Sequence, residues 1–125
     1  MNTDTEQEFV RNYIDKNFQD LLIYELSSSK KRVNAMARFS HNAEAVLDKS
    51  LNKKVIKSHD EIRESDKTLY LISSGENDGV TLPFSDAIRH CENSYSAVIV
   101  IGKGFSLIKE ETECGKPKML YLKKP

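Results

Sequence analysis

Hydrophobic residues near the start of the chain recur at intervals of three and four, the spacing of one face of an α-helix. This stripe consists of Phe9, Val10, Tyr13, Ile14, Phe18, Leu21 and Leu22. Overlapping Thr-x-x-Glu patterns within residues 3–8 are typical of helix N-termini. The pattern therefore predicts a first helix that begins at residues 4–6 and ends near residue 26, with a break near Asn17.

A second apolar stripe predicts a helix over about residues 30–52. Ser40, His41 and Asn42 interrupt it, and we expect them to kink or split the helix because all three are weak helix formers. Another capping pattern at residues 58–61 predicts a short helix anchored by Ile62.

From residue 67 onward the apolar residues form short runs bounded by turn residues, which is typical of strands. The runs are Leu69–Ile72, Ala97–Ile101, Phe105–Ile108 and Met119–Leu122. Residues 102–104 and 113–117 have the composition of turns between the last three runs, and a helix is expected at about 85–93.

This order of elements predicts a single α+β domain over residues 1–125. Its helical part, residues 1–66, holds two long helices and one short helix. These pack on a mainly antiparallel sheet of four to five strands in residues 67–125, which also contains the inserted helix.

The run at 97–101 has large apolar side chains on both strand faces, so we expect it to be covered on both sides. Val98 and Val100 lie on one face, opposite Ile99 and Ile101. If the chain's own helices cover one face only, the other face must meet a partner, because large exposed apolar patches are uncommon on monomers. This reasoning predicts a homodimer.

Composition narrows the class of protein. A length of 125 residues with 38% hydrophobic content suits one small globular domain. No apolar run approaches the ~20 residues that span a bilayer, and acidic residues 4, 6 and 8 stand where a signal peptide would be basic and then apolar. The two cysteines do not make a disulfide framework. We therefore expect a soluble cytoplasmic protein that does not engage a membrane.

Charge is unevenly distributed along a chain whose net charge is zero. Residues 1–26 hold six acidic and two basic side chains, whereas residues 30–57 hold eight basic and two acidic ones. The basic segment could contact nucleic acid through Lys30, Lys31, Arg32, Lys53 and Lys54. Two helices of opposite charge, packed together or facing a symmetry mate, explain the same pattern. The zero net charge favours the second interpretation.

Residues 73–80, Ser-Ser-Gly-Glu-Asn-Asp-Gly-Val, raise the question of a ligand-binding loop. An EF-hand match beginning at Ser74 places Glu76 and Asp78 correctly, but the twelfth position is Ser85, where a glutamate is required. A phosphate loop also fails, because the Lys-Ser/Thr pair is absent. The segment is therefore interpreted as a turn, and Gly102-Lys103-Gly104 as a hairpin in preference to a phosphate site.

Candidate catalytic chemistry is sparse. His90 and Cys91, with Asp86 nearby, are candidates for a small hydrolase or transferase, and Cys114 is a second thiol. The spacing gives no metal site, because the close Cys or His pairs of structural zinc are absent. Cys91 at helical spacing from Ile88 suits a core position better. No cofactor is predicted.

These observations identify no specific activity. The leading hypothesis is a non-enzymatic protein-interaction or regulatory module that self-associates. A nucleic-acid-associated regulator that uses segment 30–57 is the alternative, and a small enzyme that uses His90 and Cys91 is the second alternative.

Overall fold

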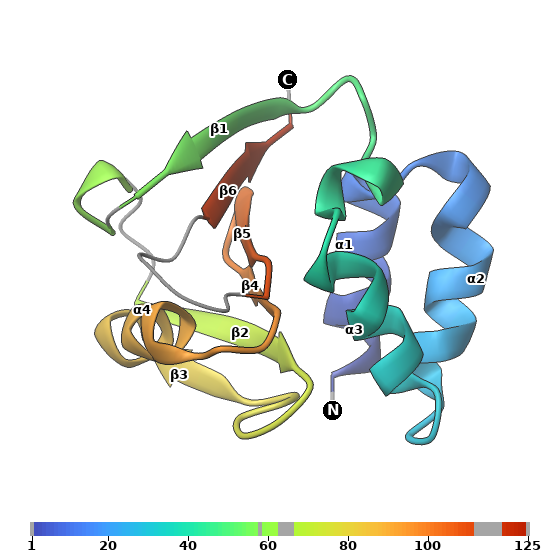
Figure 1. The fold of residues 1–125 in the computed structure, drawn as a ribbon, viewed down its shortest axis with the longest axis horizontal. Helices are drawn as coiled ribbons and strands as arrows, with labels where there is room; N and C mark the ends of the chain where they lie inside the picture. The colour runs from blue at the N-terminus through green and yellow to red at the C-terminus, as the bar shows by residue number, and fades with distance from the viewer. Residues whose placement is uncertain (1, 58, 63–66, 112–118, 125) are drawn as a thin grey trace.

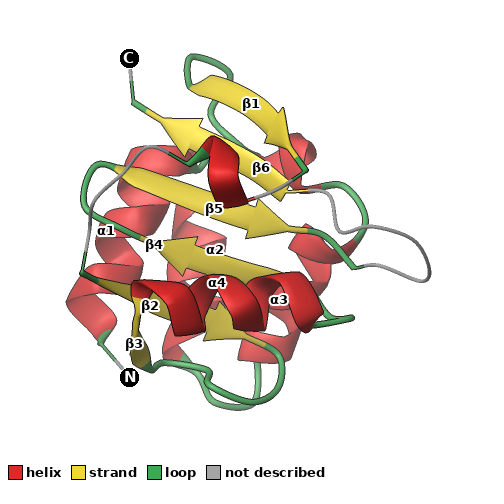
Figure 2. Cartoon of the chain, turned by 90° about the vertical axis from the view of Figure 1, so that its left-hand side faces the viewer, coloured by secondary structure: helices red, strands yellow, loops and turns green. Residues whose placement is uncertain are grey.

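The computed structural model describes residues 2–57, 59–62, 67–111 and 119–124. The described part forms three layers, with a sheet between two groups of helices (Figures 1 and 2). One face of the sheet carries α1 (Thr3–Tyr13), α2 (Lys16–Ser27) and α3 (Arg32–Ser40), and the other carries α4 (Phe84–Asn93). The predicted α+β class is confirmed.

The described sheet has six strands, antiparallel throughout, in the order β1-β6-β5-β4-β2-β3. Along the chain they are β1 (Asn52–Ile56), β2 (Thr68–Ser73), β3 (Thr81–Pro83), β4 (Val98–Ile101), β5 (Phe105–Lys109) and β6 (Met119–Lys123). Two short 3₁₀ helices, η1 (Ala43–Val46) and η2 (His59–Glu61), lie on either side of β1 in the sequence. The four predicted strands are present, whereas β1 and β3 were not predicted.

The core is divided in two by the sheet. Ile99 of β4 packs toward α1–α3, and Val98 and Val100 pack toward α4. All three side chains are fully buried. The expectation that this strand is covered on both faces is confirmed, and the chain's own helices provide both covers. The argument for a dimer assumed that one sheet face is uncovered, so it no longer holds.

The first predicted helix is two helices, α1 and α2, because the backbone turns at Ile14 and Asp15. Ile14 is extended and forms an isolated bridge with Leu47, and the Asp15 amide donates to the Val46 carbonyl at 2.9 Å. The Asp15 carboxylate then accepts from the Asn17 amide at the start of α2. The predicted break is real and lies two to three residues before Asn17.

The second predicted helix is much shorter than expected. α3 ends at Ser40, whose hydroxyl donates to the Met36 carbonyl within the helix at 3.1 Å. The chain then continues as η1 and as β1, so the predicted helix over 30–52 is wrong beyond residue 40. Strand β1 is held by backbone pairing with β6 and contributes a single buried side chain, Ile56. Such a strand leaves almost no hydrophobic pattern in the sequence.

The short predicted helix near Ile62 is the 3₁₀ turn η2. The predicted turn at 113–117 lies outside the described residues. No helix in the described ranges has both the length and the apolar character that a membrane crossing requires.

Candidate functional site

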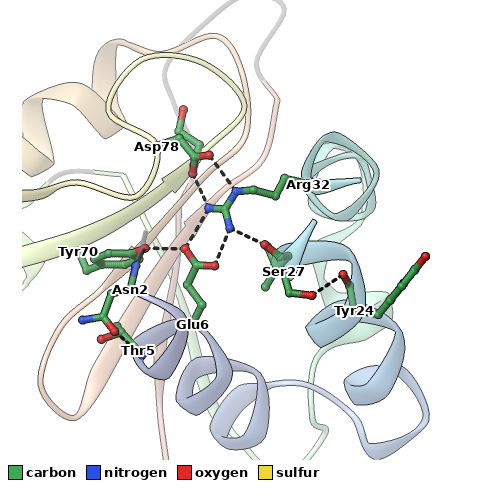
Figure 3. A network of polar contacts seen from close by, with 10 residues as sticks. Asn2, Thr5, Glu6, Tyr24, Ser27, Arg32, Tyr70 and Asp78 are labelled. Carbon is green, nitrogen blue, oxygen red and sulfur yellow. Dashed lines mark hydrogen bonds and ion pairs between the residues drawn. The ribbon is translucent and has the colours of Figure 1, made fainter. Parts of the chain in front are cut away.

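A buried polar network joins the helical layer to the sheet, with Arg32 of α3 at its centre (Figure 3). The five N–H groups of its guanidinium are all used. Nε and Nη2 donate to Asp78 at 2.9 and 2.7 Å, Nη1 and Nη2 donate to Glu6 at 2.6 and 2.9 Å, and Nη1 also donates to the Leu26 carbonyl at 2.8 Å. Burial opposes the charge of Arg32, but its hydrogen bonds with Asp78 and Glu6 raise its pKa above the ordinary value. Arg32 therefore has no donor left for a phosphate.

The carboxylates of this network have further donors. The Tyr70 hydroxyl donates to Glu6 at 2.5 Å and accepts from the Asn2 amide at 3.0 Å. The Ser73 amide donates to Asp78 at 3.1 Å. Burial first, and then the hydrogen bond to Glu6, raise the pKa of Tyr70 to about 12. The network is a structural link in which one guanidinium joins two carboxylates and every charged group is hydrogen-bonded.

Residues 73–80 form the turn between β2 and β3, as predicted. Asn77 and Gly79 adopt positive φ angles of 65° and 73°, which such residues tolerate in tight turns. Asp78, the candidate calcium ligand, is bound to Arg32 instead. Glu76 remains exposed. This stretch therefore anchors a hairpin to α3.

The three candidate catalytic residues have separate surroundings, and no described contact joins them. Cys91 is fully buried against Met119, and burial raises the pKa of its thiol to about 12. His90 Nδ1 lies 3.4 Å from Asn77 Nδ2, while Nε2 is buried without a hydrogen-bond partner in the described structure. Asp86 is exposed beside Arg89. A nucleophilic thiol needs a lowered pKa, and burial raises that of Cys91, although the charge of Lys109 acts in the opposite direction. Cys114 lies outside the described residues.

The candidate nucleic-acid residues do not gather on one surface. Lys30 and Lys31 lie in the connection between α2 and α3, whereas Lys53 and Lys54 lie on β1, at opposite ends of the molecule in Figure 1. Arg32 is 6% exposed and fully hydrogen-bonded. Lys31 also stands 5.5 Å from the Tyr24 ring centroid. A single phosphate-binding face does not follow from this placement.

Opposite charges in the first 60 residues partly compensate each other within the chain. Arg32 of α3 meets Glu6 of α1, and Arg38 of α3 meets Glu25 of α2 at 3.0 Å. Both carboxylates are buried. The interpretation of charged helices packed together accounts for these pairs.

A cleft of about 560 Å³ lies where α1 faces one end of the sheet. Three lysines from separate parts of the chain line it, Lys67, Lys103 and Lys124, together with Glu8 of α1. All four side chains are exposed, and Lys124 Nζ donates to Asn12 Oδ1 at 3.0 Å. The buried rings of Phe9, Tyr13 and Tyr70 also contribute to the lining. The cleft is concave, with an excess of positive charge among its described lining residues.

Sequence reasoning identified one residue of this cleft. Lys103 attracted attention because two glycines flank it, and the hairpin interpretation of that turn is confirmed by the pairing of β4 with β5 and by φ +85° at Gly104. The hairpin nevertheless places Lys103 at the cleft. Lys67 and Lys124 lie outside any motif.

The described residues contain no group of three or more His, Cys, Asp or Glu side chains that could hold a metal ion. Comparison of the chain with protein-family models, with curated proteins and with solved structures finds no match.

Proposed function

We propose that the protein is a non-enzymatic binding module that takes a small anionic ligand in the lysine cleft. The observation that carries the proposal is the lining of the cleft, where the described residues include three lysines and one carboxylate, Glu8. A concave site with one sign of charge concentrates ligands of the opposite sign. The volume of about 560 Å³ is typical of sites for small molecules.

Binding is a better interpretation than catalysis for this cleft. Glu8 is the only acidic residue among the described lining residues, so a pair of carboxylates for acid–base work does not meet there. The candidate nucleophile Cys91 lies in the core against Met119. The proposed module therefore holds its ligand without a covalent step.

The earlier proposals of self-association and of nucleic-acid binding stay predictions. Both faces of strand β4 are covered within the chain, so a dimer has to use another surface. Arg32 forms ion pairs with Glu6 and Asp78. The other candidate nucleic-acid contacts lie far apart, in the α2–α3 connection and on β1. These observations rank a small anionic ligand above both.

Thermal denaturation at constant ionic strength tests the proposal, with citrate, sulfate and inorganic phosphate compared against chloride. We expect the polyvalent anions to raise the Tm, because a ligand at 100 times its Kd stabilises the native state by about 2.7 kcal/mol. The double substitution Lys103→Gln and Lys124→Gln should remove most of this increase.

The matched control is Lys53→Gln with Lys54→Gln, which removes the same charge from exposed positions on β1. This control should keep the full response to anions. A response equal to that of chloride, or one that the Lys103 and Lys124 substitutions leave unchanged, would contradict the proposal.

A further inference from the structure

The three cleft lysines stand in a row across one end of the sheet. Tyr70 of β2 pairs with Ile101 of β4, so the residues before Thr68 lie beside the turn that carries Lys103. Lys123 of β6 pairs with Phe105 of β5, which places Lys124 at the same end. This is the end of the sheet toward which β4 and β6 run in Figure 2.

Strand order gives the spacing of this row. β2 and β4 are neighbours, while β5 separates β4 from β6. With strands about 4.8 Å apart, the backbones of Lys67 and Lys103 are about one strand spacing from each other, and Lys124 is about one to two spacings beyond the β4–β5 turn that carries Lys103. Two flexible ammonium groups on adjacent strands can reach one anion. The sheet end is therefore a lysine wall.

Helix α1 supplies the opposite wall of the cleft with oxygen atoms. Thr5, Glu8 and Asn12 follow each other at intervals of three and four, so they lie on one side of α1, and all three line the cleft. Their side chains offer a hydroxyl, a carboxylate and an amide oxygen as hydrogen-bond acceptors. The cleft thus has a cationic wall and an acceptor wall, which call for two different groups on one ligand.

We infer that the ligand is a sugar phosphate, either free or as part of a nucleotide. This inference rests on the proposed function. The phosphate, with a charge of about −1.5 to −2 at neutral pH, meets the lysine wall, where Lys67, Lys103 and Lys124 line the cleft. The sugar hydroxyls donate to Glu8 and to the second lone pair of Asn12 Oδ1, which already accepts from Lys124 Nζ.

The Glu8 carboxylate disfavours a ligand that carries negative charge along its whole length. A second anionic group beside its carboxylate is repelled, whereas a hydroxyl is attracted, because a carboxylate is an acceptor only. Inorganic phosphate alone also leaves most of a cleft of about 560 Å³ unfilled. A phosphate joined to a polyhydroxylated group satisfies both walls.

Isothermal titration calorimetry with ribose 5-phosphate, AMP, ribose and inorganic phosphate tests the inference. We expect ribose 5-phosphate or AMP to bind at least about tenfold more tightly than inorganic phosphate, and ribose alone to bind weakly. Lys67→Gln should weaken the sugar phosphate by about tenfold, as expected for one charge-assisted hydrogen bond.

Glu8→Gln gives the sharpest readout, because its effect should change sign with the ligand. The substitution weakens the sugar phosphate by replacing a charged acceptor with a weaker, neutral amide oxygen, and strengthens inorganic phosphate by removing a repelling charge. Asp4→Asn is the matched control: it removes the same charge from an exposed α1 position outside the described lining, and should leave both affinities nearly unchanged. Circular dichroism confirms that each variant is folded.

The outcomes separate this inference from the proposed function. Lysine-dependent binding of citrate or inorganic phosphate without a gain from the sugar would overturn the sugar phosphate and leave the anion-binding module standing. Absence of lysine-dependent binding by any of the anions would overturn both. Equal affinity for ribose 5-phosphate and AMP supports a free sugar phosphate, and tighter binding of AMP supports a nucleotide.

Discussion

Tyr70 holds its proton unusually strongly, because ionisation would place a phenolate in a buried site beside the Glu6 carboxylate. Its pKa of about 12 in the folded protein lies above the value of about 10 in an unfolded chain. The hydroxyl therefore contributes stability that is fully present below pH 10 and is lost as the pH rises through about 12.

We expect Tyr70→Phe to lower the free energy of unfolding by about 1–3 kcal/mol at neutral pH, because Glu6 loses a donor and the Asn2 amide loses an acceptor. Wild type and variant should converge as the pH rises from 10 to 12. Urea unfolding across this range measures the difference, which isolates Tyr70 from the other groups that titrate there. A constant difference at all pH values would contradict the assignment.

The sequence pattern singled out Lys103 but could not predict the cleft itself, for a physical reason. Lys67, Lys103 and Lys124 come together because the strand order β6-β5-β4-β2 brings separate turns to one end of the sheet. No local spacing encodes that order. Arg32 was misjudged for a related reason: its partners Glu6 and Asp78 are remote in sequence, so a buried charge looked like a surface one.

Among the elements, α1, α3 and the β2–β3 hairpin depend on one another through Arg32. Arg32→Ala would leave Glu6 and Asp78 without their counter-charge, and Glu6 is buried. We expect a loss of about 3–5 kcal/mol in the free energy of unfolding. Amide hydrogen exchange should show lost protection in the hairpin as well as in α3.

Arg11→Ala is the control for this substitution, because Arg11 is an exposed basic residue of α1. Its cost should stay within about 0.5 kcal/mol. If Arg32→Ala costs no more than the control, the network does not link the layers.

Elements with a double-faced apolar pattern were predicted well, and elements held by backbone pairing were not. β2 and β4 bury side chains toward both helical layers, so their apolar runs are conspicuous. β1 buries only Ile56, and β3 is three residues long with no buried side chain. Both strands exist because a neighbour offers hydrogen bonds. For β1 that neighbour, β6, is distant in the sequence, whereas β3 pairs with the nearby β2 but is too short to leave an apolar pattern.

At the scale of the whole molecule, Val100 tests whether the sheet face toward α4 is a core or an interface. We expect Val100→Lys to unfold the chain, because the side chain is completely buried in the apolar cluster under α4, where a lysine ammonium would lose its hydration. Far-UV circular dichroism and sedimentation velocity measure the result.

Val33→Lys is the comparison, since Val33 is 60% exposed on α3. It should leave both measurements unchanged. A folded Val100→Lys protein that sediments as a smaller species than the wild type would show instead that this face meets a second copy.

The place of β1 in the sheet also affects the order in which the chain can fold during synthesis. In the described sheet β1 pairs only with β6, which comes more than sixty residues later, so β1 emerges from the ribosome well before its partner. Until β6 is made, both edges of β1 are open. Lys53 and Lys54 give the β1 segment, before it pairs with β6, two exposed charges, which oppose its pairing with other chains. The same charges protect its outer edge once the sheet is complete.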